Sequence, residues 1–253
     1  KQEIICPVIF DGKTRQSLGR AAVILGSRSS SDFADVPAGI GGGWDGFRGT
    51  PELVSLFDFQ DNAHPKANEI LDKRGIFYDK NRTIDITTSV TGTFTTEGWS
   101  VYKYTNMRSD GQPGSNTTFP DTDFPMFRLA DVYLMYAEAV ARGGQGGSMA
   151  TAVGYVNALR QRAYGDTFHG INESWLREND FRNLLDERAR ELYWEGTRRT
   201  DLIRYGLFTS PNYLWTFKGG VLGGVGVDSR YNVFPIPTTD LSVNGNLRQN
   251  EGY

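Results

Sequence analysis

The chain of 253 residues is long enough for one large domain or two small ones, and 27 basic against 30 acidic side chains give it a net charge of −3. This balance argues against a nucleic-acid-binding surface and favours a neutral or weakly charged ligand. The single cysteine excludes an internal disulfide and a thiolate-rich metal site, and the sequence contains no run of 18 apolar residues that would form a membrane-spanning helix.

The first 31 residues are expected to hold one strand and a loop. Residues 1–10 are predicted to form a strand, and Pro7 favours an edge position for it. Cys6 lies in the apolar run 4–10 and is expected to be buried. Small and polar residues then predict a loop as far as about Ser31.

The segment 39–49 combines six glycines with Trp44 and Phe47. It has too little side-chain volume to bury itself, so its aromatic rings must either fill a neighbouring core or face outward. Glycine is abundant throughout (30 residues), and aromatic residues make up 13% of the chain, more than small helices need for a core. Some rings are therefore expected to be exposed, where they form binding surfaces.

Short elements are predicted after this loop. Thr50 and Pro51 are typical of the capped start of a helix that continues to Phe57. Alternating apolar residues then predict strands at 76–78, 83–88 and 99–104, followed by a polar loop over 109–121.

The second half is predicted to be helical. One helix is expected from about Pro125 to Ala141, and a second, capped by Ser148 and ended by Gly165, extends to Tyr164. The two form an antiparallel hairpin around a glycine-rich hinge at 143–147.

A densely charged stretch, 181–205, is predicted to form two more helices. Asn179 or Asp180 is expected to cap the first, Gly196 to end it, and the second covers 199–207. Because some of these charges lie in phase with the apolar stripe, we interpret them as a structural ion-pair network joining the two helices. The expected pairs are Asp186–Arg190, Glu187–Arg190, Arg188–Glu191, Glu195–Arg199 and Asp201–Arg204.

Four stretches of the chain form a pattern in a fixed order. They are the loop 43–53, the helix 123–139, Leu-Asp-Glu-Arg-Ala-Arg-Glu-Leu at 185–192 with Glu195-Gly196, and the C-terminal Asn-Val-Phe-Pro-Ile-Pro at 232–237. Together they resemble the SusD/RagB family of outer-membrane nutrient-binding lipoproteins, over nearly the whole chain. The resemblance implies a mainly α fold with short strands and long loops, built on a tetratricopeptide-like hairpin that needs stacked neighbours.

The resemblance also implies an organisation and a location. Residues 1–124 are expected to be a loop-rich, ligand-facing region and 125–253 the helical region of one continuous domain. The match to the later part of family members implies a C-terminal fragment that lacks the N-terminal half. The full-length protein is expected at the surface of a Gram-negative, Bacteroidetes-type bacterium, lipid-anchored in the outer membrane through its absent N-terminus.

The function implied by the resemblance is non-catalytic capture of an oligosaccharide or polysaccharide and its delivery to a SusC-like TonB-dependent transporter. No nucleic acid, cofactor or catalytic metal is expected. A structural calcium ion held by Asp121, Asp123 and Asp131 stays open, because some family members bind that ion.

The candidate site combines aromatic planes for sugar C–H faces with polar groups for hydroxyls. Trp44, Asp45, Phe47 and Arg48 supply this mixture within five residues. In glycan-binding relatives an earlier loop often carries an aromatic residue, but the matching position here is Leu18, which leaves Arg20 as the expected contact. The predicted strand 99–104 adds two further candidates, Trp99 and Tyr102.

Three alternatives to glycan binding stay open at this point. One is peptide capture, which part of the family performs. Another is glycoside hydrolysis by the paired carboxylates Asp121 with Asp123 or Asp186 with Glu187. The third is a purely structural repeat scaffold, which would bind no small ligand. The two histidines, His64 and His169, lie in loops without neighbouring ligands and are not favoured as catalytic groups.

Overall fold

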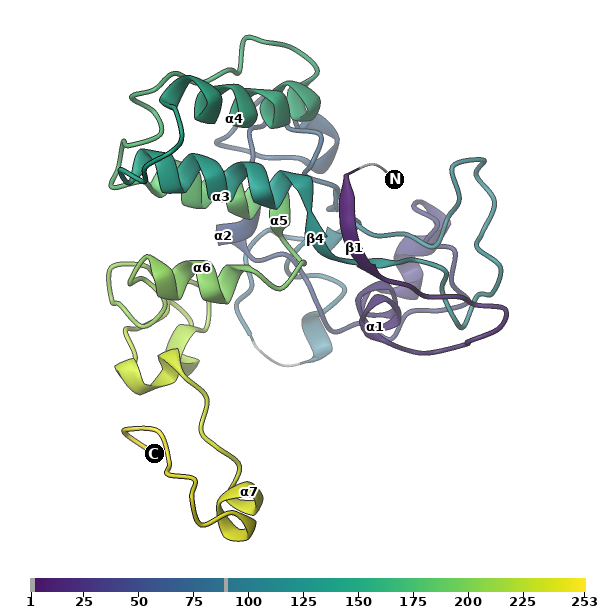
Figure 1. The fold of residues 1–253 in the computed structure, drawn as a ribbon. Helices are drawn as coiled ribbons and strands as arrows, with labels where there is room; N and C mark the ends of the chain where they lie inside the picture. The colour runs from purple at the N-terminus through teal and green to yellow at the C-terminus, as the bar shows by residue number, and fades with distance from the viewer. Residues whose placement is uncertain (1–2, 89–90) are drawn as a thin grey trace. The chain divides into compact units, whose positions relative to one another are not determined.

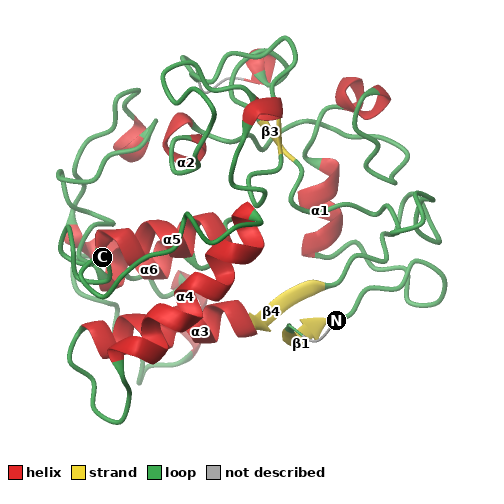
Figure 2. Ribbon diagram, turned by 90° about the horizontal axis from the view of Figure 1, so that it is seen from above, coloured by secondary structure: helices red, strands yellow, loops and turns green. Residues whose placement is uncertain are grey.

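The computed structural model describes residues 3–88 and 91–253 and is mainly helical, with short strands and long loops, as predicted (Figures 1 and 2). The chain forms two compact units, Lys1–Gly196 (unit 1) and Thr197–Tyr253 (unit 2). The division expected at residue 124 stays a prediction. None of the helices in the described part of the chain is long and apolar enough to cross a membrane.

A two-stranded antiparallel sheet joins the start of the chain to its middle. Strand β1 (Ile4–Val8) pairs with β4 (Phe124–Arg128), which places Val8 opposite Phe124. The prediction that Cys6 is buried is wrong, because a sheet of two strands leaves much of β1 uncovered and this thiol is exposed. Pro125 lies within β4 and not in the first turn of a helix.

The segment predicted as a loop before Ser31 contains a helix. Helix α1 (Arg20–Gly26) buries Ala21, Ile24 and Leu25, so its short apolar run folds against unit 1 instead of remaining a loop. Figure 2 shows α1 surrounded by long loops. Single turns of 3-10 helix occur at Ser30–Ala34, Ala67–Glu69, Thr91–Thr93, Lys218–Gly220 and Ser229–Asn232.

The elements between residues 50 and 104 are shorter than predicted. Helix α2 spans Pro51–Val54, and strands β2 (Phe77–Tyr78) and β3 (Ser100–Val101) form a two-residue antiparallel pair. The strand expected over 83–88 is absent from its described residues, where Thr83 makes a single bridge with Glu97. Packing of aromatic side chains, rather than a continuous sheet, holds this region together. That cluster consists of Val54, Phe57, Phe59, Trp99, Val101 and Tyr193.

The predicted helical hairpin is confirmed. Helices α3 (Leu129–Ala141) and α4 (Met149–Tyr164) pack against each other, and α5 (Arg182–Leu192) packs against α3 (Figure 1). The Ser148 hydroxyl accepts a hydrogen bond from the backbone N–H of Thr151, and Gly165 closes α4 in the left-handed conformation, φ 82°. Both caps were predicted. The core between these helices contains Ala130, Leu134, Ala137, Val140, Ala141, Ala152, Val156, Leu159, Leu176 and Leu184.

Helix α5 begins and ends differently from the prediction. Asn179 and Asp180 both have positive φ, and Phe181 occupies the N-cap position without a side-chain hydrogen bond. The helix stops at Leu192, four residues before Gly196, and α6 spans Arg198–Arg204.

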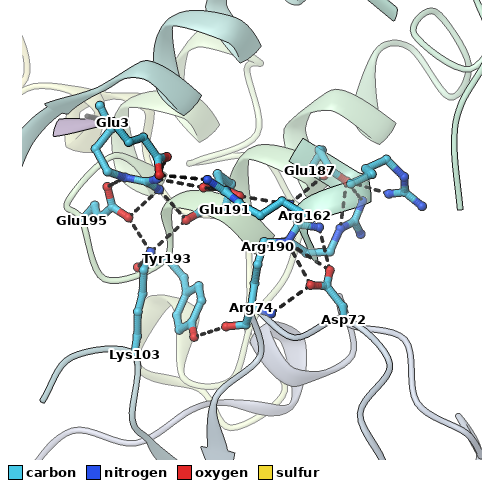
Figure 3. Close-up of polar contacts among 12 residues, drawn as sticks. Glu3, Asp72, Arg74, Lys103, Arg162, Glu187, Arg190, Glu191, Tyr193 and Glu195 are labelled. Carbon is cyan, nitrogen blue, oxygen red and sulfur yellow. Dashed lines mark hydrogen bonds and ion pairs between the residues drawn. The ribbon is translucent and has the colours of Figure 1, made fainter. Parts of the chain in front are cut away.

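The charged face of α5 forms a buried ion-pair network (Figure 3), whereas its predicted connection to the following helix stays a prediction. Glu187 is fully buried, and its carboxylate accepts hydrogen bonds from Arg74 at 2.7 Å, Arg160 at 2.8 Å and Arg190 at 2.7 Å. Burial alone would raise the pKa of Glu187, but the three guanidinium groups outweigh it and lower the pKa. The Glu187–Arg190 pair is therefore confirmed, whereas the network extends beyond helix α5 to residue 74 and helix α4.

The next turn of α5 continues this network. Glu191 is bonded by Arg128 at 2.8 Å, by Arg74 at 3.2 Å and by Arg162. Burial again opposes ionisation, but these arginines lower the pKa of Glu191 to about 2. Arg188 donates to Asp131 of α3 at 2.8 Å, and its predicted pairing with Glu191 stays a prediction.

Unit 2 contains α6, the short helix α7 (Thr238–Val243) and long loops. Lys218 is buried, and its ammonium group donates to the backbone carbonyls of Ser210 at 2.6 Å, Tyr213 at 2.7 Å and Leu207 at 3.3 Å. The same group lies 4.5 Å from the ring centroid of Trp215. One side chain thus closes the 207–218 segment by binding its backbone. The predicted pair Asp201–Arg204 is also confirmed, at 2.8 Å.

Candidate ligand-binding surface

Backbone hydrogen bonds fasten the glycine-rich loop to the end of α1. The N–H of Trp44 donates to the carbonyl of Gly26 at 2.8 Å, and that of Asp45 to the carbonyl of Arg28 at 3.1 Å. The N–H of Gly43 donates to the Ser30 hydroxyl at 2.8 Å, which in turn donates to the Gly43 carbonyl at 3.0 Å. Four bonds within three residues therefore fix the backbone that carries Trp44.

The Trp44 ring rests on Gly26, yet 62% of the residue is exposed. A Cβ atom at Gly26 would lie 2.0 Å from carbons of the Trp44 six-membered ring, so only glycine allows this contact. The ring is consequently supported on one part of its surface and open on the rest.

Phe47 is the second exposed ring of this loop, at 55% exposure. Its ring meets that of Trp194 edge to face, with centroids 6.3 Å apart. Trp194 is partly buried and was not predicted as a site residue. It adopts a left-handed backbone, φ 63°, which is rare for a large side chain.

Lys103 holds the turn that contains Trp194. Its ammonium group donates to the carbonyls of Glu191 and Tyr193, both at 2.8 Å, and to the carboxylate of Glu195 (Figure 3). Burial lowers the pKa of Lys103 to about 8. The residues on both sides of Trp194 are thus fixed by one cation.

Arg20, at the start of α1, is exposed, and its guanidinium carbon lies 5.1 Å from the centroid of the Phe124 ring. Within residues 3–88 and 91–253 it makes no hydrogen bond or ion pair, so its N–H groups are available. Leu18 lies two residues before Arg20 and is also exposed; it occupies the position at which the family resemblance implies an aromatic residue.

Arg48 has a structural role in this arrangement. Its guanidinium donates to the carbonyls of Thr88, Thr93 and Glu97, each at 3.0 Å, and lies 4.6 Å from the ring of Phe94. These bonds engage both terminal nitrogens of the guanidinium and tie the glycine-rich loop to the segment 88–97.

Trp99 and Tyr102 lie in the core, in contrast to the prediction that they contact ligand. Trp99 is 3% exposed and packs edge to face on Phe59, and Tyr102 is 5% exposed beneath the guanidinium of Arg28, 4.1 Å from its ring centroid. Trp99 belongs to the aromatic cluster around β2 and β3, and the ring of Tyr102 packs against that of Tyr78, with centroids 6.2 Å apart. The structure therefore does not offer them as ligand contacts.

The carboxylate pairs weighed for glycoside hydrolysis have structural partners. Asp121 accepts the N–H groups of Gly12 at 2.8 Å and Ser115 at 2.5 Å, and Asp123 that of Phe10 at 3.0 Å. Burial alone would raise the pKa of Asp121, but these backbone bonds lower it. A general acid for glycoside hydrolysis needs a raised pKa, which neither Asp121 nor the enclosed Glu187 has.

The two histidines and the aspartates considered for calcium binding are each paired with other side chains or with backbone groups. His64 pairs with Asp61 at 3.0 Å, and His169 with Asp166 at 2.9 Å. Asp131 accepts a hydrogen bond from Arg188, whereas Asp121 and Asp123 accept theirs from backbone N–H groups. Within the described ranges, no group of three His, Cys, Asp or Glu side chains is placed to hold a metal ion.

Helices packed around a buried charge network, a central helical hairpin and long loops with exposed rings define the class: a helical, loop-rich protein of tetratricopeptide-like construction. The SusD family model matches residues 86–253. The chain belongs to the SusD family, which confirms the resemblance read from the sequence.

Two curated relatives show the extent of the similarity. The chain is 37% identical over 289 aligned positions to the starch-binding protein SusD of Bacteroides thetaiotaomicron, covering 100% of this chain and 49% of that protein. It is 28% identical over 262 positions to the SusD-like protein P25 of Formosa agariphila, covering 98% and 44%. The chain thus spans about half the length of the curated relatives that it matches.

Solved structures share the fold. A SusD homologue from Bacteroides thetaiotaomicron superposes with a TM-score of 0.63 at 20% identity, over 98% of this chain and 46% of the other. A SusD superfamily protein from Bacteroides fragilis gives 0.61 at 21% identity, over 100% and 52%. At these identities the likeness concerns the fold alone.

Proposed function

We propose that this chain binds an oligosaccharide or polysaccharide without transforming it, through a surface formed by Trp44, Asp45, Phe47 and Arg20. The observation that carries the proposal is Trp44, which is largely exposed although its backbone is fixed and its ring rests on Gly26. A large apolar ring held open to solvent costs solvation free energy, and a ligand with a weakly polar face recovers it.

The polar groups beside this ring suit hydroxyl partners. Arg20 has unused N–H donors, and the carboxylate of Asp45 has no hydrogen-bond or ion-pair partner among the described residues. A shallow surface with two rings, one cation and one anion favours a neutral, hydroxyl-rich ligand. The starch-binding relative supports the same ligand class.

The binding is proposed to be non-catalytic. Of the carboxylates considered for hydrolysis, Asp121 and Asp123 are engaged by backbone N–H groups and Glu187 by arginines, and the pKa values of Asp121 and Glu187 are lowered. Family membership supports this reading. Release of reducing ends by the purified chain would contradict it.

We further propose that the complete protein acts at the cell surface, attached to the outer membrane by a lipid. There it would pass its ligand to a SusC-like TonB-dependent transporter. Membership of the SusD family supports this role. Co-purification of the transporter with the protein from solubilised outer membranes tests it, and recovery of the protein from the cytosol would contradict it.

The test of the binding surface is calorimetric titration with a panel of soluble polysaccharides, α-glucans included. Trp44→Ala is expected to weaken binding about tenfold or more, since a central aromatic contact is worth upwards of about 1.4 kcal/mol. Phe168→Ala is the matched control, because Phe168 is 94% exposed on a separate loop of unit 1. The Phe168→Ala variant should bind the polysaccharides with the same affinity as the unmodified chain.

Equal affinities for Trp44→Ala and the unmodified chain, with unchanged circular dichroism, would remove Trp44 from the site. Binding of peptides but of no polysaccharide in the panel would overturn the glycan assignment and favour peptide capture.

A further inference from the structure

Aromatic rings continue from the exposed Trp44 and Phe47 of the glycine-rich loop to the partly buried Trp194 near the start of α1. Trp44 rests on Gly26, the last residue of this helix, and Arg20 is its first residue. A helix of seven residues is about 10 Å long. The two contacts therefore lie at opposite ends of an element longer than a single sugar ring.

Arg20 and Trp194 come together at the first of these ends. A Cβ atom on Gly196 would lie 3.1 Å from Nη1 of Arg20, so the guanidinium sits directly against the turn that carries Trp194. Trp194 in turn packs against the core beneath α1, which includes Ala21 and Ile24. Phe47 touches Trp194 and belongs to the same loop as Trp44, so it connects the two ends.

Both groups at this end keep unused donors. Neither the guanidinium of Arg20 nor the indole N–H of Trp194 has an acceptor among the residues that the structure describes. Lys103 fixes the residues on either side of Trp194 and thereby maintains its left-handed backbone. Strained residues that their surroundings hold in place are frequent at binding sites.

We propose that Trp194 and Arg20 form a second contact region of the same surface, so that several consecutive units of a linear oligosaccharide lie along α1 from Trp44 to Trp194. The inference rests on the proposed function and adds its geometry: the surface recognises length. A short ligand reaches Trp44 alone, and a longer one also reaches Arg20 and Trp194. Affinity therefore rises with the number of sugar units.

Titration with linear maltooligosaccharides, from maltose to maltooctaose, tests this geometry. The unmodified chain is expected to bind the longest members about tenfold more tightly than the shortest. Arg20→Met keeps the apolar stem of the side chain and removes its donors, and it should weaken the longest members far more than the shortest, which abolishes most of this gain. Trp194→Leu should do the same, and Trp44→Ala should weaken every member of the series.

The control is Arg15→Met, which removes the same charge from an exposed residue. Arg15 makes no hydrogen bond, ion pair or ring contact with the residues that the structure describes. It should retain the full dependence on length. Because Trp194 also packs on the core, Arg20→Met decides the question if Trp194→Leu fails to fold. Long and short ligands weakened equally by Arg20→Met, or not weakened at all, would overturn the inference while the Trp44 site stands. A chain that binds a polysaccharide of the panel but no member of this series would overturn the inference alone, and binding that is independent of Trp44 would overturn the proposed binding surface as well.

Discussion

Unit 1 and unit 2 place their charged side chains in different surroundings. In unit 1, Glu187 and Glu191 are buried and surrounded by arginines from α4 and from segments distant in the sequence. Arginines lie on aromatic rings in both units. In unit 2, Arg198, Arg199 and Arg230 all do so, and the buried Asp201 is bonded by Arg204. The guanidinium of Arg199 is 4.8 Å from the ring centroid of Phe208 and 4.2 Å from that of Phe234. The apolar packing differs in parallel. The three core clusters of the described residues belong to unit 1, and in the range 197–253 only Leu202 and Leu207 are buried apolar residues.

Buried ion pairs and arginine–aromatic contacts stabilise different parts of a protein. Buried carboxylates require several exact partners, so they join particular segments and are intolerant of change. Arginine–aromatic stacks remain partly solvated and contribute less each, so they order loops without a core. The candidate ligand-binding surface lies on unit 1, where Lys103 and Glu195 extend the charge network to the turn of Trp194.

The largest effect is expected from Glu187→Gln. Removing this charge takes the anion from the buried guanidinium groups of Arg160 and Arg190 and one of three carboxylate partners from Arg74, which should lower the free energy of unfolding by about 3–5 kcal/mol. Urea denaturation measures the change, and hydrogen exchange read peptide by peptide locates it in α5 and around residue 74.

The control for this variant is Glu69→Gln, which removes an exposed pair with Lys66 and should change stability by no more than about 1 kcal/mol. Faster exchange across 208–235 in Glu187→Gln would show that the two units do not differ as described.

A second effect follows from Glu191. Its folded pKa of about 2 lies below the ordinary value of 4.5, so the carboxylate contributes stability that is complete above pH 4.5 and is lost as the pH falls towards 2. The loss is on the order of 3 kcal/mol. Denaturation curves between pH 6 and pH 2 should show it, with exchange in α5 accelerating before exchange in 208–235. Constant stability over this range would contradict the network.

The smallest effect is expected in unit 2. Arg199→Met removes two ring contacts and the hydrogen bond to the Tyr231 carbonyl at 2.7 Å, which should reduce protection in 205–235 by about 1 kcal/mol. Arg248 is exposed and makes no hydrogen bond, ion pair or ring contact with the described residues, so Arg248→Met should leave the protection of 205–235 against hydrogen exchange unchanged. An Arg199→Met variant that unfolds unit 2 completely would show that a few stacks act as a core.

Local signals in the sequence predicted the helical part well. The caps of α4, Ser148 and Gly165, act through their own backbone neighbourhood, so three or four residues suffice to identify them. Helix α1 was missed because seven residues of apolar character show too little periodicity to be distinguished from a loop.

The candidate site could be predicted only in part. Trp44 stands out because six glycines surround it with little volume. The burial of Trp99 and Tyr102 depends on which face of a strand is covered, and alternation alone does not tell. Trp194 depends on a contact with Phe47 that spans most of unit 1, although a tryptophan directly before Glu195-Gly196 at a helix end is an available signal.

Lys218 has a consequence for how the sequence can vary. Surface loops usually accept insertions and deletions, because their length matters little to the rest of a protein. Here the carbonyls of Leu207, Ser210 and Tyr213 must all reach one ammonium group. A single added or deleted residue between 207 and 218 would move at least one of them out of range. Although it contains little regular structure, this stretch is therefore expected to tolerate neither insertions nor deletions.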